Sequence, residues 1–298
     1  MRCDLKKIKT AIIGPGNIGQ DLMIKMSRSP YLELACVIGI VESQGMQRAR
    51  AMGADASIQG VDYLASKHPD VQIVFDATSA KAHEAASPKL QQAGFFCLDL
   101  TPAAIGPYCV PAVNLDESML DLPEVNMVTC AGQATTPIVA AINGVADVYY
   151  AETISSLGSK SAGPGTRANI DEFTVTTRNA LMKIGGAENA KAIIILNPAE
   201  PPIYMSNTIY TRVRKVDLPA ISAAVEEMGE RIRKYVPGYR FKMQPILKDN
   251  NDDIIMTIVE VEGLGDYLPV YAGNLDIINT AAIETAEAKA RKLLGEQA

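Results

Sequence analysis

A glycine-rich turn near the N-terminus constrains the fold of this chain more than any other feature. Residues 14–19 read Gly-Pro-Gly-Asn-Ile-Gly and fit the pattern G-x-G-x-x-G. A run typical of a buried strand precedes the turn at 9–13, and apolar residues at helical spacing follow it over 18–26. Strand, glycine turn and helix in this order are typical of a dinucleotide-binding unit.

The rest of the chain divides into two patterns. Further strands are expected at 32–40, 71–75, 95–98 and 125–129, which indicates an α/β domain with a parallel sheet. Longer strands are expected at 149–157, 192–196, 207–213 and 254–261, with a helix at 218–235, which favours a mixed and largely antiparallel second domain. A final helix at 279–294 is expected to return to the first domain.

The composition of the chain limits its number of domains, its possible partners and its cellular compartment. A chain of 298 residues with 48% hydrophobic residues favours two domains, and 28 basic against 34 acidic residues give no field that attracts nucleic acid or anionic lipid. No apolar run approaches the roughly 20 residues that cross a bilayer, and no signal peptide is recognisable. Five irregularly spaced cysteines and two histidines indicate reduced thiols in the cytoplasm and argue against a zinc site.

The three glycines of the turn have distinct expected roles. Gly14 permits the tight turn, Gly16 lets the backbone approach a pyrophosphate, and Gly19 allows the helix to pack closely on the strand. Glu42 lies where an acidic residue would bind the adenosine ribose and favour NAD over NADP. Glu42 can also simply begin a loop, and the nearby Arg48 and Arg50 can instead meet a 2′-phosphate.

A cysteine follows the strand expected at 125–129. Cys130 precedes an apolar helical run, with Thr136 and Pro137 suited to a helix start. Free amides there are expected to lower the thiol pKa and to stabilise an oxyanion, so Cys130 is a candidate nucleophile, although most cysteines are buried structural residues. With a dinucleotide fold this predicts addition of a thiolate to an aldehyde, hydride transfer to nicotinamide and a thioester. Water, phosphate or a second thiol can discharge that thioester.

Several stretches of the chain resemble CoA-acylating acetaldehyde dehydrogenase. The similarity spans nearly the whole chain in order, and it rests on the segments at 129–135, 159–173, 197–202, 262–269 and 272–277. The resemblance implies NAD-dependent conversion of acetaldehyde or propanal and CoA into acyl-CoA. It also implies a homodimer and association with a 4-hydroxy-2-oxovalerate aldolase.

The resemblance further implies a fold like that of glyceraldehyde-3-phosphate dehydrogenase. In that fold a Rossmann-type parallel sheet domain, here 1–132 and 274–298, is combined with an inserted α+β catalytic and dimerisation domain, here 133–273. Cys130 matches the nucleophile of the family, and Asn169 matches an amide that orients the substrate. The segments that match NAD-contacting positions comprise Pro15, Gly16, Asn17, Ile18, Ser161, Ala162, Gly163, Pro164, Gly165, Thr166, Arg167, Ala168, Asn169 and Asn274.

The chain departs from the family pattern at three places. Asn207 stands where the family usually has a carboxylate thought to assist the cysteine, and an amide can orient a group but cannot act as a general base. Ala131 stands where Gly is usual, and the loop at 40–43 lacks the common Asp pattern.

Two alternative functions therefore stay open. One is a phosphorylating or reductive semialdehyde dehydrogenase, and the other is a catalytically weakened NAD-binding subunit of an aldolase. Among the remaining residues, His83 can approach the cofactor but reads better as a surface histidine on a helix. A basic run comprising Arg231, Arg233, Lys234, Arg240 and Lys242 can meet CoA phosphates but reads better as a solvated face.

Overall fold

The chain folds into two compact units, seen here in a computed structural model that describes residues 6–163, 166–167, 169–248 and 253–296. Unit 1 comprises Met1–Cys109, Leu115–Met127 and Ala282–Ala298, and unit 2 comprises Val110–Asn114 and Val128–Ala281. Apart from the short segment at 110–114, the divisions fall at 127/128 and 281/282, whereas the sequence analysis expected them at 132/133 and 273/274. As a result, Cys130 belongs to unit 2.

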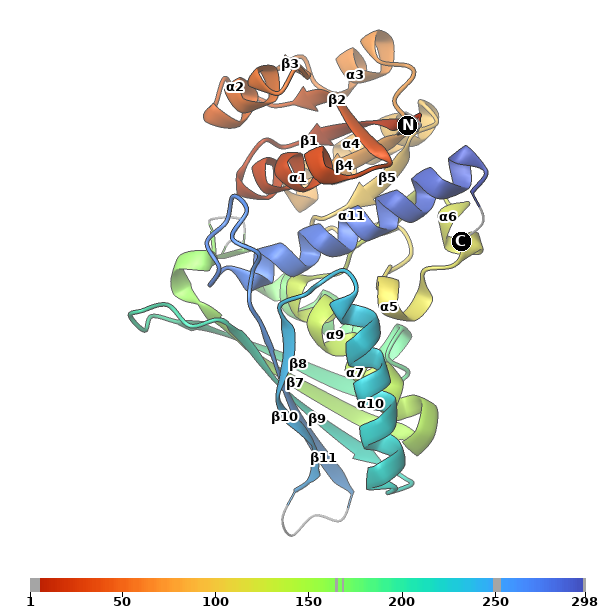
Figure 1. Cartoon of the computed structure of the whole chain (residues 1–298), viewed down its shortest axis with the longest axis vertical. Coiled ribbons are helices and arrows are strands. Elements are labelled where there is room, and N and C mark those ends of the chain that lie inside the picture. Colours follow the sequence, from red (N-terminus) through yellow and green to blue (C-terminus); the bar gives the residue numbers. More distant parts are fainter. Residues whose placement is uncertain (1–5, 164–165, 168, 249–252, 297–298) are drawn as a thin grey trace, which may run out of the picture. The chain divides into compact units, whose positions relative to one another are not determined.

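Unit 1 is built on a six-stranded parallel sheet. Its strands are β1 (Ile8–Ile13), β2 (Leu32–Ile38), β3 (Asp55–Ser57), β4 (Ile73–Asp76), β5 (Phe96–Asp99) and β6 (Glu124–Asn126). They lie in the order β3-β2-β1-β4-β5-β6, and every pairing is parallel (Figure 1). This order is that of a doubly wound dinucleotide-binding sheet, so the predicted α/β class is confirmed.

Helices cover both faces of this sheet because its strands bury side chains on both sides. On β1, Thr10 contacts Met26 of α1, whereas Ala11 packs in a cluster with Leu64 of α3 and Leu90 of α4. The helices that precede β6 in the chain are α1 (Asn17–Arg28), α2 (Gln44–Ala51), α3 (Val61–Lys67), α4 (Ala80–Gln92), α5 (Pro111–Asn114) and α6 (Glu117–Leu120). All of them belong to unit 1 except α5, which belongs to unit 2.

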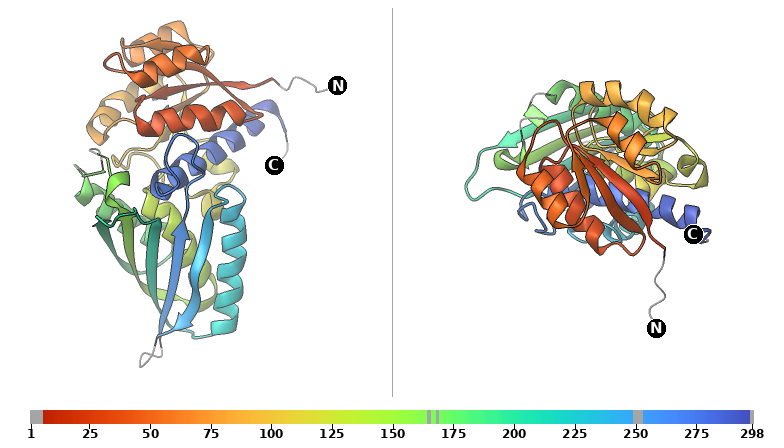
Figure 2. Two further views of the ribbon diagram at one scale, coloured as in Figure 1. Left: turned by 60° about the vertical axis from the view of Figure 1, so that its left-hand side comes forward. Right: turned by 90° about the horizontal axis from the view of Figure 1, so that it is seen from above.

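Unit 2 is a sheet covered by helices on one face (Figures 1 and 2). Its strands β7 (Val148–Gly158), β8 (Asn189–Asn197), β9 (Met205–Val213), β10 (Tyr239–Leu247) and β11 (Ile254–Val261) lie in the order β10-β11-β9-β7-β8. Only β7 and β8 pair in parallel, which confirms the expected mixed, largely antiparallel arrangement. The helices are α7 (Cys130–Ala146), the 3-10 turn η1 (Ser159–Ser161), α9 (Ile170–Lys183), α10 (Leu218–Arg233) and the first part of α11 (Gly273–Leu294).

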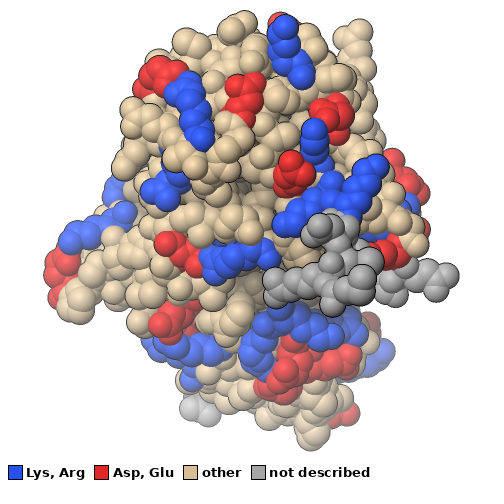
Figure 3. Space-filling model, turned by 45° about the horizontal axis from the view of Figure 1, so that its top comes forward, with Lys and Arg blue, Asp and Glu red and all other residues tan. Residues whose placement is uncertain are grey.

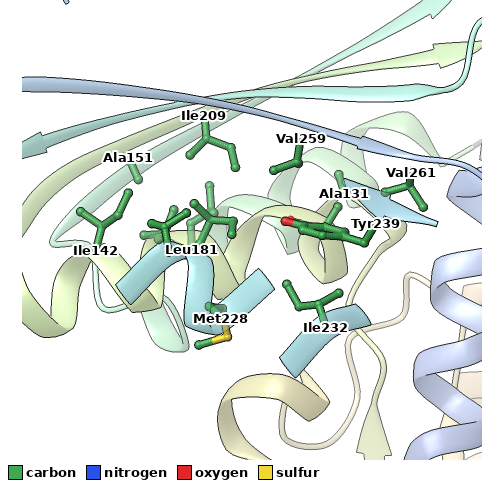
Figure 4. Close-up of a cluster of buried hydrophobic side chains, with 14 of the residues drawn as sticks. Ala131, Ile142, Ala151, Leu181, Ile209, Met228, Ile232, Tyr239, Val259 and Val261 are labelled. Carbon is green, nitrogen blue, oxygen red and sulfur yellow. The ribbon is translucent and has the colours of Figure 1, made fainter. Parts of the chain in front are cut away.

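The core of unit 2 lies between its sheet and α7 (Figure 4). The Tyr239 ring is buried beside Ala131, and its hydroxyl donates to the backbone carbonyl of Ala134 at 2.8 Å. Ile142 of α7 and Ile209 of β9 belong to the same cluster. The first turn of α7 is thus packed into the largest apolar core of the unit, which fixes its position.

Several elements differ from the sequence-based expectations. Strand β10 and helix α9 were not anticipated, β6 ends at Asn126 rather than at 129, and α11 begins at Gly273 rather than at 279. Among the residues that the structure describes, every helix is too short or too polar to span a bilayer. On the face shown in Figure 3, Lys and Arg side chains are interspersed with Asp and Glu rather than gathered into one basic surface.

Candidate active site and coenzyme pocket

The first glycine of the N-terminal turn is required by its backbone conformation. Gly14 has a φ of +93°, and a Cβ added there would lie 2.7 Å from the carbonyl oxygen of Ala77, just after β4. The amide of Gly14 donates to the carbonyl of Ile38 at 2.9 Å. The turn is therefore held between the ends of β2 and β4 and tolerates no side chain at this position.

A cavity of about 450 Å³ lies within unit 1 beside this turn. Helix α1 begins next to it with Gly16 as its N-cap, a residue without a side chain that could cap the helix. Backbone amides at a helix start favour an anion such as a pyrophosphate. The cavity is large and mostly apolar, as a nucleotide requires, and its lining includes Gly14, Pro15, Gly39, Ile40, Ile58, Asp76, Thr78 and Ser79.

Glu42 lies on the surface after β2 but is not among the residues that line the cavity. Its carboxylate accepts two hydrogen bonds from Arg50, at 2.7 and 2.9 Å, and these hydrogen bonds lower the pKa of Glu42. Arg48 instead donates to Gln20 at 3.2 Å. The recognition of the ribose by Glu42 stays a prediction, and Arg50, its rival for a 2′-phosphate, is already engaged by Glu42.

In unit 2, the turn that leads into Cys130 is strained. Val128 is buried and has a φ of +60°, which β-branched residues rarely adopt because the side chain meets the backbone. A Cβ added at Gly132 would lie 2.5 Å from the Val128 side chain, so these two residues fit together only with glycine at 132. Conformations of this kind cost about 1–3 kcal/mol and persist mainly at functional sites.

Cys130 is the first residue of α7. The side chain of Thr129 caps the helix by accepting from the amide of Gly132 at 2.9 Å. The Thr129 hydroxyl also lies 2.7 Å from that of Thr177 in α9. The helix begins at Cys130 and not at 136–137, where the sequence analysis placed its start.

The expected activation of the thiol is wrong for the described state. Burial raises the pKa of Cys130 to about 12, although backbone amides of Ala131 and Cys130 act in the opposite direction. The residue as a whole is 8% exposed and therefore buried. Desolvation of the charged thiolate therefore outweighs the helix start, and Cys130 carries its proton at neutral pH.

The loop expected to contact NAD is described only in part. Pro164, Gly165 and Ala168 lie outside the described residues. Arg167 donates from Nε to the carbonyl of Ala162 at 3.0 Å and from Nη2 to Ser159 at 2.9 Å, so these nitrogens hold the loop itself. Asn169 is the N-cap residue of α9, but its side chain does not cap that helix. The roles of this loop, including those of Ser161, Ala162, Gly163 and Thr166, stay predictions.

Two asparagines singled out by sequence are deeply buried in unit 2. Asn207 lies on β9 facing the core, and neither polar atom of its amide has a hydrogen-bond partner among the described residues. It pairs across the sheet with Ser155 of β7, whose hydroxyl is likewise unpartnered. Asn274, at the start of α11, is 1% exposed, and both polar atoms of its amide also lack a hydrogen-bond partner among the described residues. Such groups need a partner such as a water or a ligand.

His83 is not the surface histidine that the sequence analysis favoured. It is fully buried in unit 1, where Nδ1 lies 2.9 Å from Asp76 and Nε2 contacts Glu124 and lies 3.5 Å from Asp99. Burial disfavours the imidazolium, but the hydrogen bonds to Asp76 and Glu124 and the nearby charges prevail and raise the pKa of His83 to about 10. No sequence pattern signalled this cluster.

Four of the five side chains in the basic run of α10 and β10 pair with acidic neighbours. Ion pairs join Arg231 to Glu227, Arg233 to Glu226 and Glu230, Arg240 to Glu260 and Glu262, and Lys242 to Glu260. These pairs favour the solvated face over a site for CoA phosphates.

Known proteins similar to this chain agree with the two-unit division. Residues 9–121 match the family described as semialdehyde dehydrogenase, NAD binding domain, and residues 130–269 match prokaryotic acetaldehyde dehydrogenase, dimerisation. A solved structure of aspartate semialdehyde dehydrogenase II from Vibrio cholerae shares the fold, with a TM-score of 0.66 over 95% of this chain and 98% of that one at 12% identity.

Similarity to curated relatives extends over nearly the whole chain. Acetaldehyde dehydrogenase from Carboxydothermus hydrogenoformans is 60% identical over 98% of this chain and 96% of the relative. Acetaldehyde dehydrogenase 1 from Comamonas testosteroni is 53% identical over 97% and 95%, and the Thermus thermophilus enzyme is 50% identical over 98% and 97%. This confirms the resemblance drawn from the sequence, and the chain belongs to the acetaldehyde dehydrogenase family.

Proposed function

We propose that this protein is an NAD-dependent, CoA-acylating dehydrogenase of short aldehydes, with Cys130 as its nucleophile. The observation that carries the proposal is the strained turn at Val128, which presents a cysteine as the first residue of a buried helix in a chain of this family. Strain of this size is retained where function needs the resulting geometry.

The reaction begins at Cys130. Its sulfur bonds to the aldehyde carbon, the thiol proton leaves, and the carbonyl oxygen becomes an oxyanion. Amides in the first turn of α7 are donors of the kind that stabilise such an oxyanion. NAD, when bound, supplies the acceptor for the hydride that leaves this carbon. The thiol of CoA then attacks the thioester, and Cys130 leaves as a thiolate, so aldehyde, NAD⁺ and CoA give acyl-CoA, NADH and a proton.

Since the Cys130 thiol is protonated at rest, its proton must move when the substrate binds. The amide of Asn207 cannot accept that proton, so we assign Asn207 an orienting role through hydrogen bonds to a substrate or a water. The unpartnered state of both of its polar atoms supports this role.

The assay follows NADH formation from acetaldehyde and propanal with CoA, with phosphate in place of CoA, and with neither. The proposal expects sustained turnover only with CoA, and none in Cys130→Ser. Turnover sustained by phosphate would favour the semialdehyde-type alternative, and NAD binding without any acyl transfer would favour a weakened subunit of an aldolase.

Asn207→Asp and Asn207→Leu test the orienting role. If the amide orients a group, we expect both variants to lose activity, whereas a gain in kcat with Asp alone would show that the native amide is a handicap. A buried, unpaired carboxyl has a raised pKa, so the destabilisation by Asp should be larger at pH 9 than at pH 5.

We further propose a homodimer formed through the sheet face of unit 2 that its helices leave uncovered. On that face, Ile154 of β7 and Ile258 of β11 are half-buried and flank Thr208 of β9 in one row. The description of the family matched by 130–269 names dimerisation. Ile258→Lys should give a monomer by light scattering after size exclusion, whereas Asp62→Asn on the exposed surface of α3 in unit 1 should remain dimeric.

The aldolase partner and the compartment are proposals of the same kind. Association with a 4-hydroxy-2-oxovalerate aldolase rests on the family resemblance, and co-elution of the two purified proteins tests it. A cytoplasmic location is supported by the free thiols of Cys36, Cys97 and Cys130, since thiols outside disulfides suit a reducing compartment.

A further inference from the structure

A buried cluster of charged side chains lies under the coenzyme pocket of unit 1. His83 of α4 contacts Asp76 at the end of β4 and Glu124 at the start of β6, and it lies near Asp99 at the end of β5. All four side chains are at most 2% exposed. Cys97 of β5 also lies beside His83 and Glu124. One histidine thus bridges carboxylates from three neighbouring strands.

The cluster is joined to the pocket through Asp76. One of its carboxylate oxygens faces His83 Nδ1, and the other accepts from the amide and the hydroxyl of Thr78, at 3.0 and 2.5 Å. Thr78 and Asp76 both line the cavity of about 450 Å³ beside the glycine turn. The bond to His83 therefore fixes the carboxylate that orders this part of the pocket wall.

The same segment supports the glycine turn. The position of a Cβ on Gly14 would be 2.7 Å from the carbonyl oxygen of Ala77 and 3.1 Å from the Thr78 side chain, so the turn rests directly on these residues. Ala77 in turn donates its amide to Ile13 at 2.8 Å. A shift of the segment from Asp76 to Thr78 would displace the turn that is proposed to receive the pyrophosphate.

We infer that His83 is a positioning residue for the coenzyme: by holding Asp76, it sets the Ala77–Thr78 segment on which the Gly14 turn rests. The inference rests on the coenzyme binding proposed above. It assigns a task to a residue that touches neither the pocket nor the substrate.

Two substitutions separate the two ends of the imidazole. In His83→Asn the side-chain amide nitrogen can occupy the position of Nδ1, so it can still donate to Asp76. In His83→Gln the amide nitrogen lies one carbon further along the side chain, near the position of Nε2, and donates toward Glu124 instead. Both variants remove the charge and most of the ring, so their losses in stability should be similar. Only His83→Gln should lose the hold on Asp76.

The test measures the Kd of NADH by fluorescence titration of the purified full-length chain, with thermal melting as a measure of folding. We expect His83→Asn to bind NADH within about threefold of wild type and His83→Gln to bind at least tenfold more weakly, with the KM for NAD raised and the KM for aldehyde unchanged. Ser87→Ala is the control, because Ser87 also contacts Glu124 but not Asp76. It should leave the Kd unchanged.

Equal NADH affinity in His83→Asn and His83→Gln would overturn the inference. If both variants fail to fold, a second pair of variants tests the hydrogen bond between the Thr78 hydroxyl and Asp76. Thr78→Val removes this bond and Thr78→Ser keeps it. Equal NADH affinities in this pair would also overturn the inference. If the wild type does not bind NADH, both the proposed function and this inference are overturned. The titration of the wild type shows this before any variant is made.

Discussion

The hydroxyl of Thr129 lies 2.7 Å from the hydroxyl of Thr177, and this contact joins the start of α7 to the middle of α9. The direction of the hydrogen bonds follows from counting protons. Thr177 donates to the carbonyl of Phe173 at 2.8 Å, so Thr129 must donate to Thr177 while it accepts from the amide of Gly132. The turn that carries Cys130 is thus tied to the helix that follows the loop at 161–169.

Thr177→Val should therefore reduce activity. Valine keeps the shape of the side chain but leaves the buried Thr129 hydroxyl without its acceptor, at a cost of about 1–2 kcal/mol. We expect kcat to fall about tenfold because the first turn of α7 shifts. Thr174→Val is the matched control, since Thr174 makes the same kind of bond to the carbonyl of Ile170 in α9. Equal effects in both variants would contradict the prediction.

Gly132→Ala should disrupt the turn at Cys130. The added methyl would lie 2.5 Å from the Val128 side chain and 3.2 Å from the Thr129 hydroxyl. We expect a loss of about 1–3 kcal/mol in unfolding free energy and of nearly all activity. On the same helix, a Cβ at Gly144 would meet nothing within 4 Å. Gly144→Ala should raise stability by about 0.5–1 kcal/mol with activity unchanged, as urea unfolding and NADH formation would measure.

Alkylation of Cys130 should be slow at neutral pH. Because burial raises the pKa of this thiol to about 12, the thiolate fraction is small at pH 7 and grows about tenfold per pH unit. The rate of iodoacetamide labelling, followed by mass spectrometry of the Cys130 peptide, should still be rising at pH 10. A rate that levels off below pH 8 would show an activated thiolate in the resting protein.

The sequence predicted the parallel sheet, the glycine turn and the position of Cys130 because each depends on local spacing. Strand β10 escaped recognition because Pro245 and the charged residues Arg240 and Lys242 mask its alternation, although both charges point to the uncovered side and pair with Glu260. Helix α9 was missed because its Thr and Val residues favour strands.

The protonation of Cys130 and the existence of the His83 cluster depend instead on which side chains the tertiary fold buries together. The sequence indicated a helix start near Cys130, at 136–137, but the desolvation that raises the pKa of Cys130 depends on its burial in the core cluster of unit 2. The His83 cluster could not be found for the same reason. Its carboxylates lie 23 to 48 residues apart along the chain, and only the parallel register that sets Asp76 beside Asp99 brings them together.

The His83 cluster also predicts how stability depends on pH. The folded-state pKa of His83, about 10, lies above the value of 6.5 for an unperturbed histidine, so folding takes up a proton between these values. The stabilisation is therefore complete below about pH 6.5 and is lost as the pH rises through about 10. His83→Gln lacks this titration. Within the range from pH 7 to pH 10, the unfolding free energies of wild type and this variant, measured in urea, should differ most at pH 7, and the difference should shrink steadily toward pH 10. The comparison of two proteins cancels the titration of groups far from His83, but not that of Asp99 and Glu124, whose pKa values His83 lowers. A difference that stays constant from pH 7 to pH 10 would mean that His83 is neutral in the folded chain, and that its contacts with Asp76 and Glu124 do not involve an imidazolium.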